Sequence, residues 1–314
     1  MSRIYEALKR AESERMTSVE AQPRIKESAD SAPSIRDGMF LAPKTDLPPH
    51  DPAVLGPGEP SLSTPPAFDL QRIPKRPWNP SSVHLPALLN QGALAEQFRG
   101  LGSRLVELRH EHPLKVLLIS SGLPREGKSF IAANLAISLA RRRNSRVLLI
   151  DGDMRHSTLH ALLGCEWQPS LCDYLAGKAS ALEVIQEADP THSSGKLPPS
   201  ILQNLFFIPG GNGGAEAADL SSDSRFAELI ATVASSFEWI VVDSSPVISA
   251  SDTVNLARAC DGVLLVARAG TTPFQAAQRA QKELQTSNIL GLVLNGADGG
   301  TVASYYHGTI YPEA

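Results

Sequence analysis

Six short, almost continuously apolar runs constrain the fold of this chain more than any other feature. They are KVLLIS (115–120), RVLLID (146–151), NLFFIP (204–209), EWIVVD (238–243), GVLLVA (262–267) and ILGLVL (289–294). Strands that are apolar on both faces belong in a parallel sheet covered by helices. Stretches with helical spacing alternate with these runs, at 128–142, 223–236, 252–260 and 273–286. The pattern predicts a doubly wound α/β domain with a mostly parallel sheet, over residues 87–300.

Proline separates this domain from the start of the chain. Fourteen of the 24 prolines lie in residues 23–86, and the segment has neither a helical nor a strand period. Such a segment cannot bury enough apolar surface to offset its ordering entropy, so residues 16–86 are predicted to be a disordered linker. A short amphipathic helix is predicted within residues 1–15, because three apolar residues there follow helical spacing, Ile4, Leu8 and Ala11. It is either a docking peptide for a partner or a frayed helix, too short to be stable alone.

The composition argues against several classes of protein. The net charge of −4 and the pI near 6.1 leave no basic footprint for nucleic acid. No apolar run approaches the roughly 18 residues that a membrane span needs. The charged start, MSRIYEALKRAESER, does not resemble a secretory signal. The three cysteines (Cys165, Cys172, Cys260) lack metal-ligand spacing and suit a reducing cytoplasm. We therefore expect a cytoplasmic protein that reaches a membrane only through a partner.

The segment SSGLPREGKSF (120–130) contains the phosphate-loop pattern G-x-x-x-x-G-K-[ST]. In this pattern, backbone N–H groups wrap a phosphate, the lysine reaches the β- and γ-phosphates, and the hydroxyl can ligate Mg²⁺. A strand is expected to end at Ser120 and a helix to begin at Lys128, as the motif requires, so a chance glycine-rich turn is the weaker interpretation. The residues expected to bind ATP are Gly122, Glu126, Gly127, Lys128, Ser129 and Phe130.

Acidic residues follow two of the predicted strands: Asp151 and Asp153 after one, with Arg155 behind them, and Asp243 after another. The carboxyl ends of parallel strands share one edge with the phosphate loop, so these groups should converge. We expect Mg²⁺ to be held by Ser129, Asp243 and Asp151, and catalysis to use Lys128, Asp151, Asp153 and Arg155. Asp151 is expected to act on an attacking hydroxyl or water. Each aspartate alone could instead be a helix N-cap, and Arg155 could form a surface salt bridge.

Three of the five tyrosines, Tyr305, Tyr306 and Tyr311, lie in the last eleven residues, SYYHGTIYPEA. The run 289–294 is expected to lie parallel to the strand before the phosphate loop, so the tail (301–314) starts at the nucleotide edge of the sheet. About ten residues separate that run from Tyr305, a reach of at most about 35 Å. The tyrosines are therefore candidate phosphate acceptors, although a solvated terminus is the simpler interpretation of the tail alone.

Taken in order, these motifs resemble those of the bacterial tyrosine autokinases, which accompany capsule and exopolysaccharide export. The resemblance covers residues 90–314 and rests on the phosphate loop, Asp151-Gly152-Asp153-Met154-Arg155, Asp243-Ser244-Ser245-Pro246 and the tyrosine cluster. It implies a P-loop fold of the deviant-Walker type and Mg²⁺- and ATP-dependent phosphorylation of the tail, usually between subunits of a ring. The start SRIYEALKRAE is similar to that of stand-alone members. The resemblance implies a membrane activator of the polysaccharide-copolymerase type, a cognate tyrosine phosphatase, and a place at the inner face of the plasma membrane.

The sequence departs from the family pattern at three places. Arg125 stands where the family usually has a small residue, often glycine. The subunit-contact pattern E-x-x-R-x-x-R is present at Glu96 and Arg99 but has Gly102 in place of the second arginine, which weakens the prediction of a ring. Its two glycines also weaken that helix by about 1 kcal/mol each. The family's N-P-x-E-L-L segment is replaced by AEAADL at 215–220.

Two other functions stay open from the sequence. Partition and septum-positioning ATPases share the fold, but they carry a lysine one residue after the first loop glycine, where this chain has Leu123. The favoured family also lacks that lysine, so Leu123 favours the kinase. A protein that binds ATP and a membrane partner but does not phosphorylate is the third interpretation, which Arg125 and Gly102 keep open.

Overall fold

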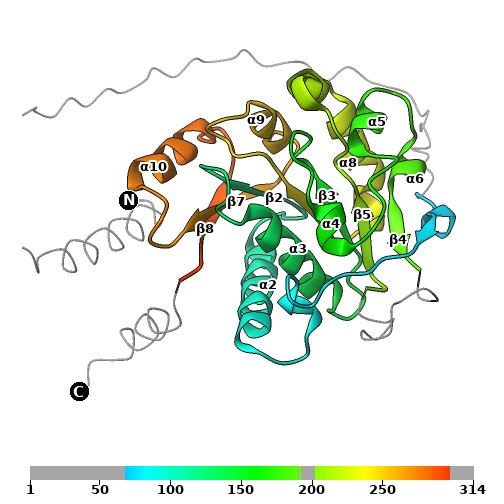
Figure 1. Ribbon diagram of the computed structural model, residues 1–314, viewed down its shortest axis with the longest axis horizontal. Coiled ribbons are helices and arrows are strands. Elements are labelled where there is room, and N and C mark those ends of the chain that lie inside the picture. Colours follow the sequence, from blue (N-terminus) through cyan, green and yellow to red (C-terminus); the bar gives the residue numbers. More distant parts are fainter. Residues whose placement is uncertain (1–67, 190, 192–201, 298–314) are drawn as a thin grey trace, which may run out of the picture. The chain divides into compact units, whose positions relative to one another are not determined.

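The computed structural model describes residues 68–189, 191 and 202–297, and all structural statements refer to these residues (Figure 1). They form an eight-stranded sheet in the order β1-β4-β5-β3-β6-β2-β7-β8. The strands are β1 (Lys75–Arg76), β2 (Val116–Ser121), β3 (Val147–Asp151), β4 (Gln186–Ala188), β5 (Leu205–Ile208), β6 (Trp239–Asp243), β7 (Gly262–Arg268) and β8 (Ile289–Asn295). Every pairing is parallel except that between β4 and β5. The six predicted strands and the mostly parallel sheet are therefore confirmed.

Helices connect these strands. The α-helices are α2 (Ala93–Glu111), α3 (Lys128–Ala140), α4 (Leu159–Leu163), α5 (Leu171–Leu175), α6 (Ala181–Val184), α7 (Ala217–Ser222), α8 (Arg225–Val233), α9 (Asp252–Ala257) and α10 (Phe274–Glu283). The 3₁₀ turns are η1 (Leu70–Arg72), η2 (Pro86–Leu88), η5 (Gly214–Glu216) and η6 (Ala234–Ser236). The four helices expected from apolar spacing are present as α3, α8, α9 and α10, each slightly shorter than predicted.

The alternation of side chains along each strand feeds two separate cores. Leu117, Ile119 and their counterparts on the same face pack with α2 and α3. Their neighbours Val116 and Leu118 face the other way and pack with α8, α9 and α10. Because both faces are covered, the strands are apolar throughout, and the doubly wound architecture follows from the continuous apolar runs.

Residues 68–86 correct the predicted linker boundary. The sequence predicts disorder as far as residue 86, whereas Ile73, Trp78 and Leu85 are buried in the cores of the domain. Trp78 packs edge-to-face on Phe207 at 6.2 Å between ring centroids, and its Nε1 donates to Gln186 Oε1 at 3.1 Å. Packing against the sheet orders this segment, so its sequence needs no helical or strand periodicity. The predicted helix at 1–15, the linker up to residue 67 and the tail at 301–314 lie outside the described residues.

The helix α2 is continuous through Gly100 and Gly102, despite their low helix propensity. Gly102 is buried, and a Cβ at this position would lie 3.5 Å from Leu139 Cδ2 of α3. A Cβ there would only make ordinary van der Waals contact, whereas a longer side chain such as that of arginine would have to displace α3. Glu96 and Arg99, by contrast, form an ion pair on the outer side of α2. None of the helices in the described part of the chain combines the length and apolar character that crossing a bilayer would require.

Candidate active site

The phosphate loop joins β2 to α3, and its conformation depends on Gly127. This residue has φ of 94° and forms the N-cap of α3. A Cβ on Gly127 would lie 2.1 Å from Asn295 Nδ2, a distance that no side chain tolerates. The same Asn295 amide donates to the carbonyl of Glu126 at 2.9 Å. Glycine is thus required both by the left-handed backbone and by the close approach of the β8 end.

The side chain of Glu126 is turned into the protein and organises the loop. One carboxylate oxygen accepts from the backbone N–H of Leu123 at 2.8 Å, and the other accepts from the hydroxyl of Thr272. The residue is buried. The prediction that Glu126 contacts the nucleotide is therefore limited to its backbone, because its carboxylate is already engaged.

Unpaired backbone donors line the loop. Among the described residues, none accepts a hydrogen bond from the backbone N–H groups of residues 125–129. These groups include the first donors of α3, which have no partner within a helix. Together with the helix dipole they form a cradle that favours an anion such as a phosphate. The backbone geometry therefore fits the predicted phosphate site.

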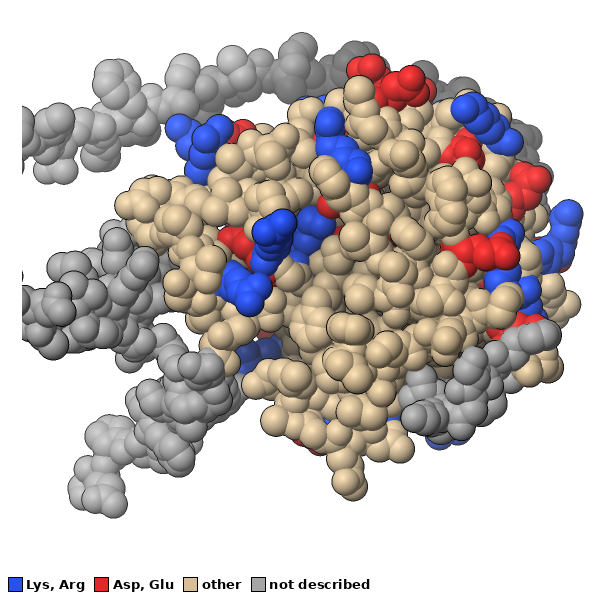
Figure 2. Space-filling view, viewed as in Figure 1, with Lys and Arg blue, Asp and Glu red and all other residues tan. Residues whose placement is uncertain are grey.

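Arg125 departs from ordinary backbone geometry within this loop. Its φ is 65°, one of two positive values among described non-glycine residues. A side chain in this region costs on the order of 1–3 kcal/mol, which glycine would avoid. Arg125 is exposed, and Figure 2 shows basic side chains gathered over the region where Figure 1 labels β7 and β2.

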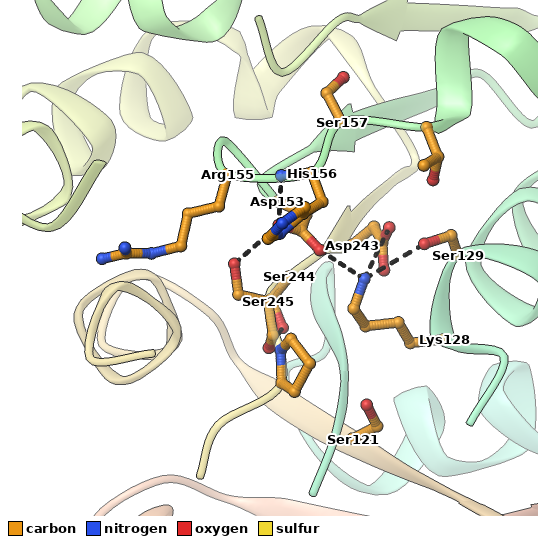
Figure 3. A network of polar contacts seen from close by, with 12 residues as sticks. Ser121, Lys128, Ser129, Asp153, Arg155, His156, Ser157, Asp243, Ser244 and Ser245 are labelled. Atoms are coloured by element: carbon orange, nitrogen blue, oxygen red, sulfur yellow. Dashed lines mark hydrogen bonds and ion pairs between the residues drawn. The ribbon is translucent and has the colours of Figure 1, made fainter. Parts of the chain in front are cut away.

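Lys128 is the centre of the polar network drawn in Figure 3. Its Nζ lies 2.7 Å from Asp153 Oδ2, 3.3 Å from Ser129 Oγ and 3.8 Å from Asp243 Oδ2. Burial alone would lower the pKa of Lys128, but the charges of Asp243 and Asp153 outweigh it and the pKa is raised. The lysine is therefore a cation held between two carboxylates, next to the loop donors.

Asp243 is fully buried, yet no described residue makes a hydrogen bond of ordinary geometry to either of its oxygens. Ser129 and the backbone N–H of Ser244 are near enough to favour its charged form, and Lys128 favours it more strongly. Burial still raises the pKa of Asp243 to about 6. A buried carboxylate with free lone pairs beside a hydroxyl is a donor set that suits Mg²⁺, so Asp243 and Ser129 fit the predicted metal site.

Asp151 lies opposite Asp243 on the neighbouring strand, in direct register. Its Oδ2 accepts from Ser157 Oγ at 2.8 Å and from the N–H groups of Thr158 and Leu159 at 3.1 Å each. Its Oδ1 accepts from the N–H of Asp153 at 3.2 Å. Burial, followed by the charge of Asp243, raises the pKa of Asp151 to about 7. Both oxygens are thus committed to the loop between β3 and α4.

Asp153 faces the opposite way, into the network. Besides Lys128, it accepts at Oδ1 from Ser245 Oγ at 2.9 Å and from the N–H of His156 at 3.1 Å. Burial would raise its pKa, but Lys128 and these hydrogen bonds hold it below the usual value. Asp153 is therefore ionised and directed at the lysine of the phosphate loop.

Arg155 is held away from the phosphate loop and extends away from Lys128 in Figure 3. Its Nε donates to Asp252 Oδ1 at 3.2 Å, and that buried carboxylate also accepts from Ser245 Oγ at 2.9 Å. The sequence leaves Arg155 either a catalytic role or a salt bridge, and in this structure it forms the salt bridge. It is a pairing with a buried partner rather than a surface contact.

Two other predicted ATP-binding residues, Phe130 and Gly122, take part in packing between the helices and the loop. Phe130 packs edge-to-face on Phe98 of α2, with 5.7 Å between ring centroids. A Cβ on Gly122 would meet the Ala276 carbonyl at 3.2 Å and Ala280 Cβ at 3.3 Å, so this glycine allows α10 to pack on the loop. Tyr305, Tyr306 and Tyr311 lie outside the described residues.

Four polar residues of this site were missed from the sequence: Ser245, Asp252, Thr272 and Asn295. Asn295 ends the last strand, so the rule that selected Asp243, a polar residue at the carboxyl end of an apolar run, could have found it. Ser245 follows Asp243 by two residues and could have been included on the same ground. Asp252 and Thr272 carry no such signal, because their partners Arg155 and Glu126 are distant in sequence.

Comparisons of the sequence with curated proteins give tyrosine-protein kinases as relatives. No family model matches the chain. It is 29% identical over 222 residues to tyrosine-protein kinase YwqD of Bacillus subtilis (strain 168), which covers 68% of this chain and 86% of that protein. It is 30% identical over 201 residues to tyrosine-protein kinase CpsD of Streptococcus agalactiae serotype III (strain NEM316), covering 61% of this chain and 78% of that protein. Other tyrosine-protein kinase relatives are longer, and the chain spans only 26% or 27% of them.

A solved structure supports the same assignment. The kinase domain of Escherichia coli tyrosine kinase ETK superimposes with a TM-score of 0.60 at 26% identity. The match covers 68% of this chain and 79% of that domain.

Proposed function

The chain belongs to the bacterial tyrosine-protein kinases, and on this premise we propose that it transfers the γ-phosphate of ATP to its own tyrosines, Tyr305, Tyr306 and Tyr311. The observation that carries the proposal is that both carboxylate oxygens of buried Asp243 lack a hydrogen-bond donor among the described residues. They lie next to Lys128, Ser129 and the unpaired N–H groups of the loop. This arrangement has donors for a phosphate and acceptors for a divalent metal at one point.

Ser129 and Asp243 are the residues that would hold Mg²⁺. When bound, this ion would neutralise charge on the phosphate oxygens. The backbone N–H groups of residues 125–129 would bind phosphate oxygens, and Gly127 allows their close approach. Lys128 is already in its charged form, so it would exchange part of its contact with Asp153 for a phosphate oxygen.

The two aspartates after β3 would serve catalysis in different ways. Asp153 faces the network and is ionised, so it is the group that would receive a proton from an incoming tyrosine hydroxyl. Asp151 would act as a positioning residue, because its hydrogen bonds shape the loop that carries Asp153. A direct role for Asp151 as a metal ligand would require one of these bonds to break.

The tail leaves the sheet close to this site. Asn295, the last residue of β8, donates to the carbonyl of Glu126 in the phosphate loop, so the chain continues from the nucleotide edge. Tyr305 follows ten residues later, within about 35 Å along an extended chain. A tyrosine could therefore enter this active site or that of a neighbouring subunit. Phosphorylation of the tail would regulate capsule or exopolysaccharide synthesis and export, through a membrane activator and a cognate phosphatase, at the inner face of the plasma membrane.

The test is to incubate the full chain with γ-labelled ATP and Mg²⁺ and to map the label. Label on Tyr305, Tyr306 or Tyr311 that disappears in Lys128→Met supports the proposal. Release of free phosphate without protein label would instead indicate an ATPase, and nucleotide binding with neither would indicate an adaptor. A variant with all three tyrosines changed to phenylalanine should bind nucleotide as before but carry no label on the tail.

A further inference from the structure

Two exposed arginines lie at the phosphate loop. Arg125 lies in the loop itself, and Arg268 ends β7. In the sheet, β2 carries the loop and lies between β6, which ends in Asp243, and β7. The basic side chains that gather over β7 and β2 in Figure 2 are on this part of the surface. The loop therefore has Asp243 at the strand end on one side and Arg268 at the strand end on the other.

A chain of hydrogen bonds fixes Arg268 against the loop. The backbone N–H of Arg268 donates to Thr272 Oγ1 at 2.8 Å, and the Thr272 hydroxyl donates to the carboxylate of Glu126. The side chain returns to the loop, where its Nη1 donates to the carbonyl of Arg125 at 3.4 Å. The N–H of Ala269 donates to the carbonyl of Asn295 at 2.8 Å, which joins the β7 and β8 ends. Arg268 is thus positioned by the same residues that shape the phosphate loop.

Neither arginine has an acidic partner among the described residues. The nearest carboxylate in sequence to Arg125 is that of Glu126, and both of its oxygens point inward to Leu123 and Thr272. The Arg268 guanidinium contacts the backbone of Arg125, so two cationic side chains without an acidic partner meet at this point of the loop, and an anion bound there would offset their charge. Guanidinium groups present paired donors that match phosphate oxygens.

The backbone at Arg125 points to the same conclusion. Its φ of 65° is a conformation that glycine adopts freely, and an arginine there is strained. The chain nevertheless places a long cationic side chain at this position of the phosphate loop. We propose that Arg125 and Arg268 form a phosphate-binding pair at the rim of the loop, in addition to Lys128 and the backbone cradle. The proposal rests on the nucleotide site of the proposed function, but not on tyrosine transfer.

The phosphate could belong to the bound nucleotide or to a phosphorylated tyrosine of the tail, and binding measurements on the full chain distinguish them. The variants are Arg125→Gly, Arg268→Gln and the two combined. The matched control is Arg143→Gln, an exposed arginine just beyond the far end of α3. The probes are Mg·ADP and adenosine, titrated by calorimetry, and a labelled peptide of residues 301–314 with phosphate on Tyr306, followed by fluorescence anisotropy. The unphosphorylated peptide is the reference. None of these measurements depends on kinase activity.

If the nucleotide supplies the phosphate, the double variant should bind Mg·ADP about tenfold more weakly, since charge-assisted hydrogen bonds are lost. Adenosine binding and the Arg143→Gln variant should be unchanged. If the tail supplies it, the phosphopeptide should lose its advantage over the unphosphorylated peptide while Mg·ADP binding stays the same. Arg125→Gly relieves backbone strain, so its melting temperature should not fall, and weaker binding cannot then be attributed to unfolding. Unchanged binding of both phosphate probes in the double variant would overturn the proposal.

Discussion

The strands β3 and β6 both end in an aspartate, at paired positions, but the two carboxylates have different surroundings. Asp151 and Asp243 are both fully buried and lie side by side in register. Asp151 accepts four hydrogen bonds from its own loop. Asp243 accepts none of ordinary geometry from any described residue. The same residue type at the same edge of the sheet is thus surrounded by hydrogen-bond donors on one strand and lacks them on the next.

This difference separates residues that shape the site from those that would act in it. A buried carboxylate without hydrogen-bond donors is costly, because it has lost its hydration and only the Lys128 ammonium, 3.8 Å away, offsets this loss. Folding alone does not favour such a group, and a ligand that supplies positive charge would offset the cost. For Asp151, the hydrogen bonds from its own loop already offset the loss of hydration. We therefore expect substitution of Asp243 to affect mainly metal binding and activity, and substitution of Asp151 to affect mainly the stability of the fold.

The largest expected effect is that of Asp243→Asn on activity. The substitution keeps the size of the side chain but removes the charge that would hold Mg²⁺, so phosphorylation should fall on the order of 10²–10³-fold. The fold should be retained, because no hydrogen bond to Asp243 is lost. Initial rates of label transfer, measured over a range of Mg²⁺ concentrations, test this. A variant that transfers phosphate at the normal rate would show that Asp243 is not the metal ligand.

Asp151→Asn should have its main effect on stability. The amide nitrogen cannot accept a hydrogen bond, so whichever side it occupies leaves buried N–H donors without a partner, at a cost of about 1–3 kcal/mol. Denaturant unfolding of the wild type and the variant measures the loss. Ser157→Ala is the control, since it removes one of the four hydrogen bonds and should cost less. If Asp151→Asn is as stable as the wild type but inactive, Asp151 takes part in the reaction itself.

The sequence predicts the convergence of these groups but not the difference between them. The strands and the phosphate loop are encoded locally, by apolar runs and by spacing, so six strands and the position of the loop could be predicted. Asp151 and Asp243 look alike from the sequence, since each is an aspartate after an apolar run. What distinguishes them is whether the following backbone turns back, as it does at Thr158 and Leu159, to donate to the carboxylate.

Contacts between distant segments account for the other parts that could not be predicted. Residues 68–86 are ordered because Trp78 packs on Phe207 and pairs with Gln186, and neither partner is visible from the local composition. The pairing of Arg155 with Asp252 spans 97 positions of sequence. Asp252 alone has the appearance of an ordinary first residue of a helix. Local patterns therefore indicate where the site lies, whereas the partner of each charge is decided by the tertiary structure.

The dependence of stability on pH provides a third, smaller test of the comparison. Burial raises the pKa of Asp243 from 3.8 to about 6. The folded protein therefore holds a proton on Asp243 that the unfolded chain releases above about pH 4. This contribution to stability is complete below pH 4 and is lost as the pH rises through 6. In Asp243→Asn the contribution is absent.

Without Mg²⁺ or nucleotide, the melting temperature of Asp243→Asn relative to the wild type should thus increase by a few degrees between about pH 4 and pH 7. Thermal unfolding in a series of buffers of equal ionic strength measures the difference between the two proteins. Saturating Mg²⁺ should raise the melting temperature of the wild type more than that of the variant. A difference that stays constant over this range would mean that Asp243 is ionised in the folded protein at pH 4 already.

The smallest expected effect concerns Ser245, which links the two loops. Its hydroxyl lies 2.9 Å from Asp153 Oδ1 and 2.9 Å from Asp252 Oδ2, and its single hydrogen can be donated to only one of them at a time. Asp153 retains Lys128 and the N–H of His156 when this hydroxyl is removed. Ser245→Ala should therefore cost about 1 kcal/mol of stability. In the wild type this hydrogen bond lowers the pKa of Asp153. Its loss should therefore raise that pKa and move the acid side of the pH–rate profile to higher pH.

Ser244→Ala is the matched control for this substitution. The Ser244 hydroxyl is also buried, but it donates to the carbonyl oxygens of Ile119 and Ser245 and to no carboxylate. Its loss should reduce stability by a similar amount without moving the pH–rate profile. The two serines follow Asp243 directly, so they differ mainly in whether the hydroxyl reaches across to the β3 loop. An unmoved profile in Ser245→Ala would mean that Ser245 acts only through packing, and that Lys128 and the N–H of His156 are enough to keep Asp153 charged.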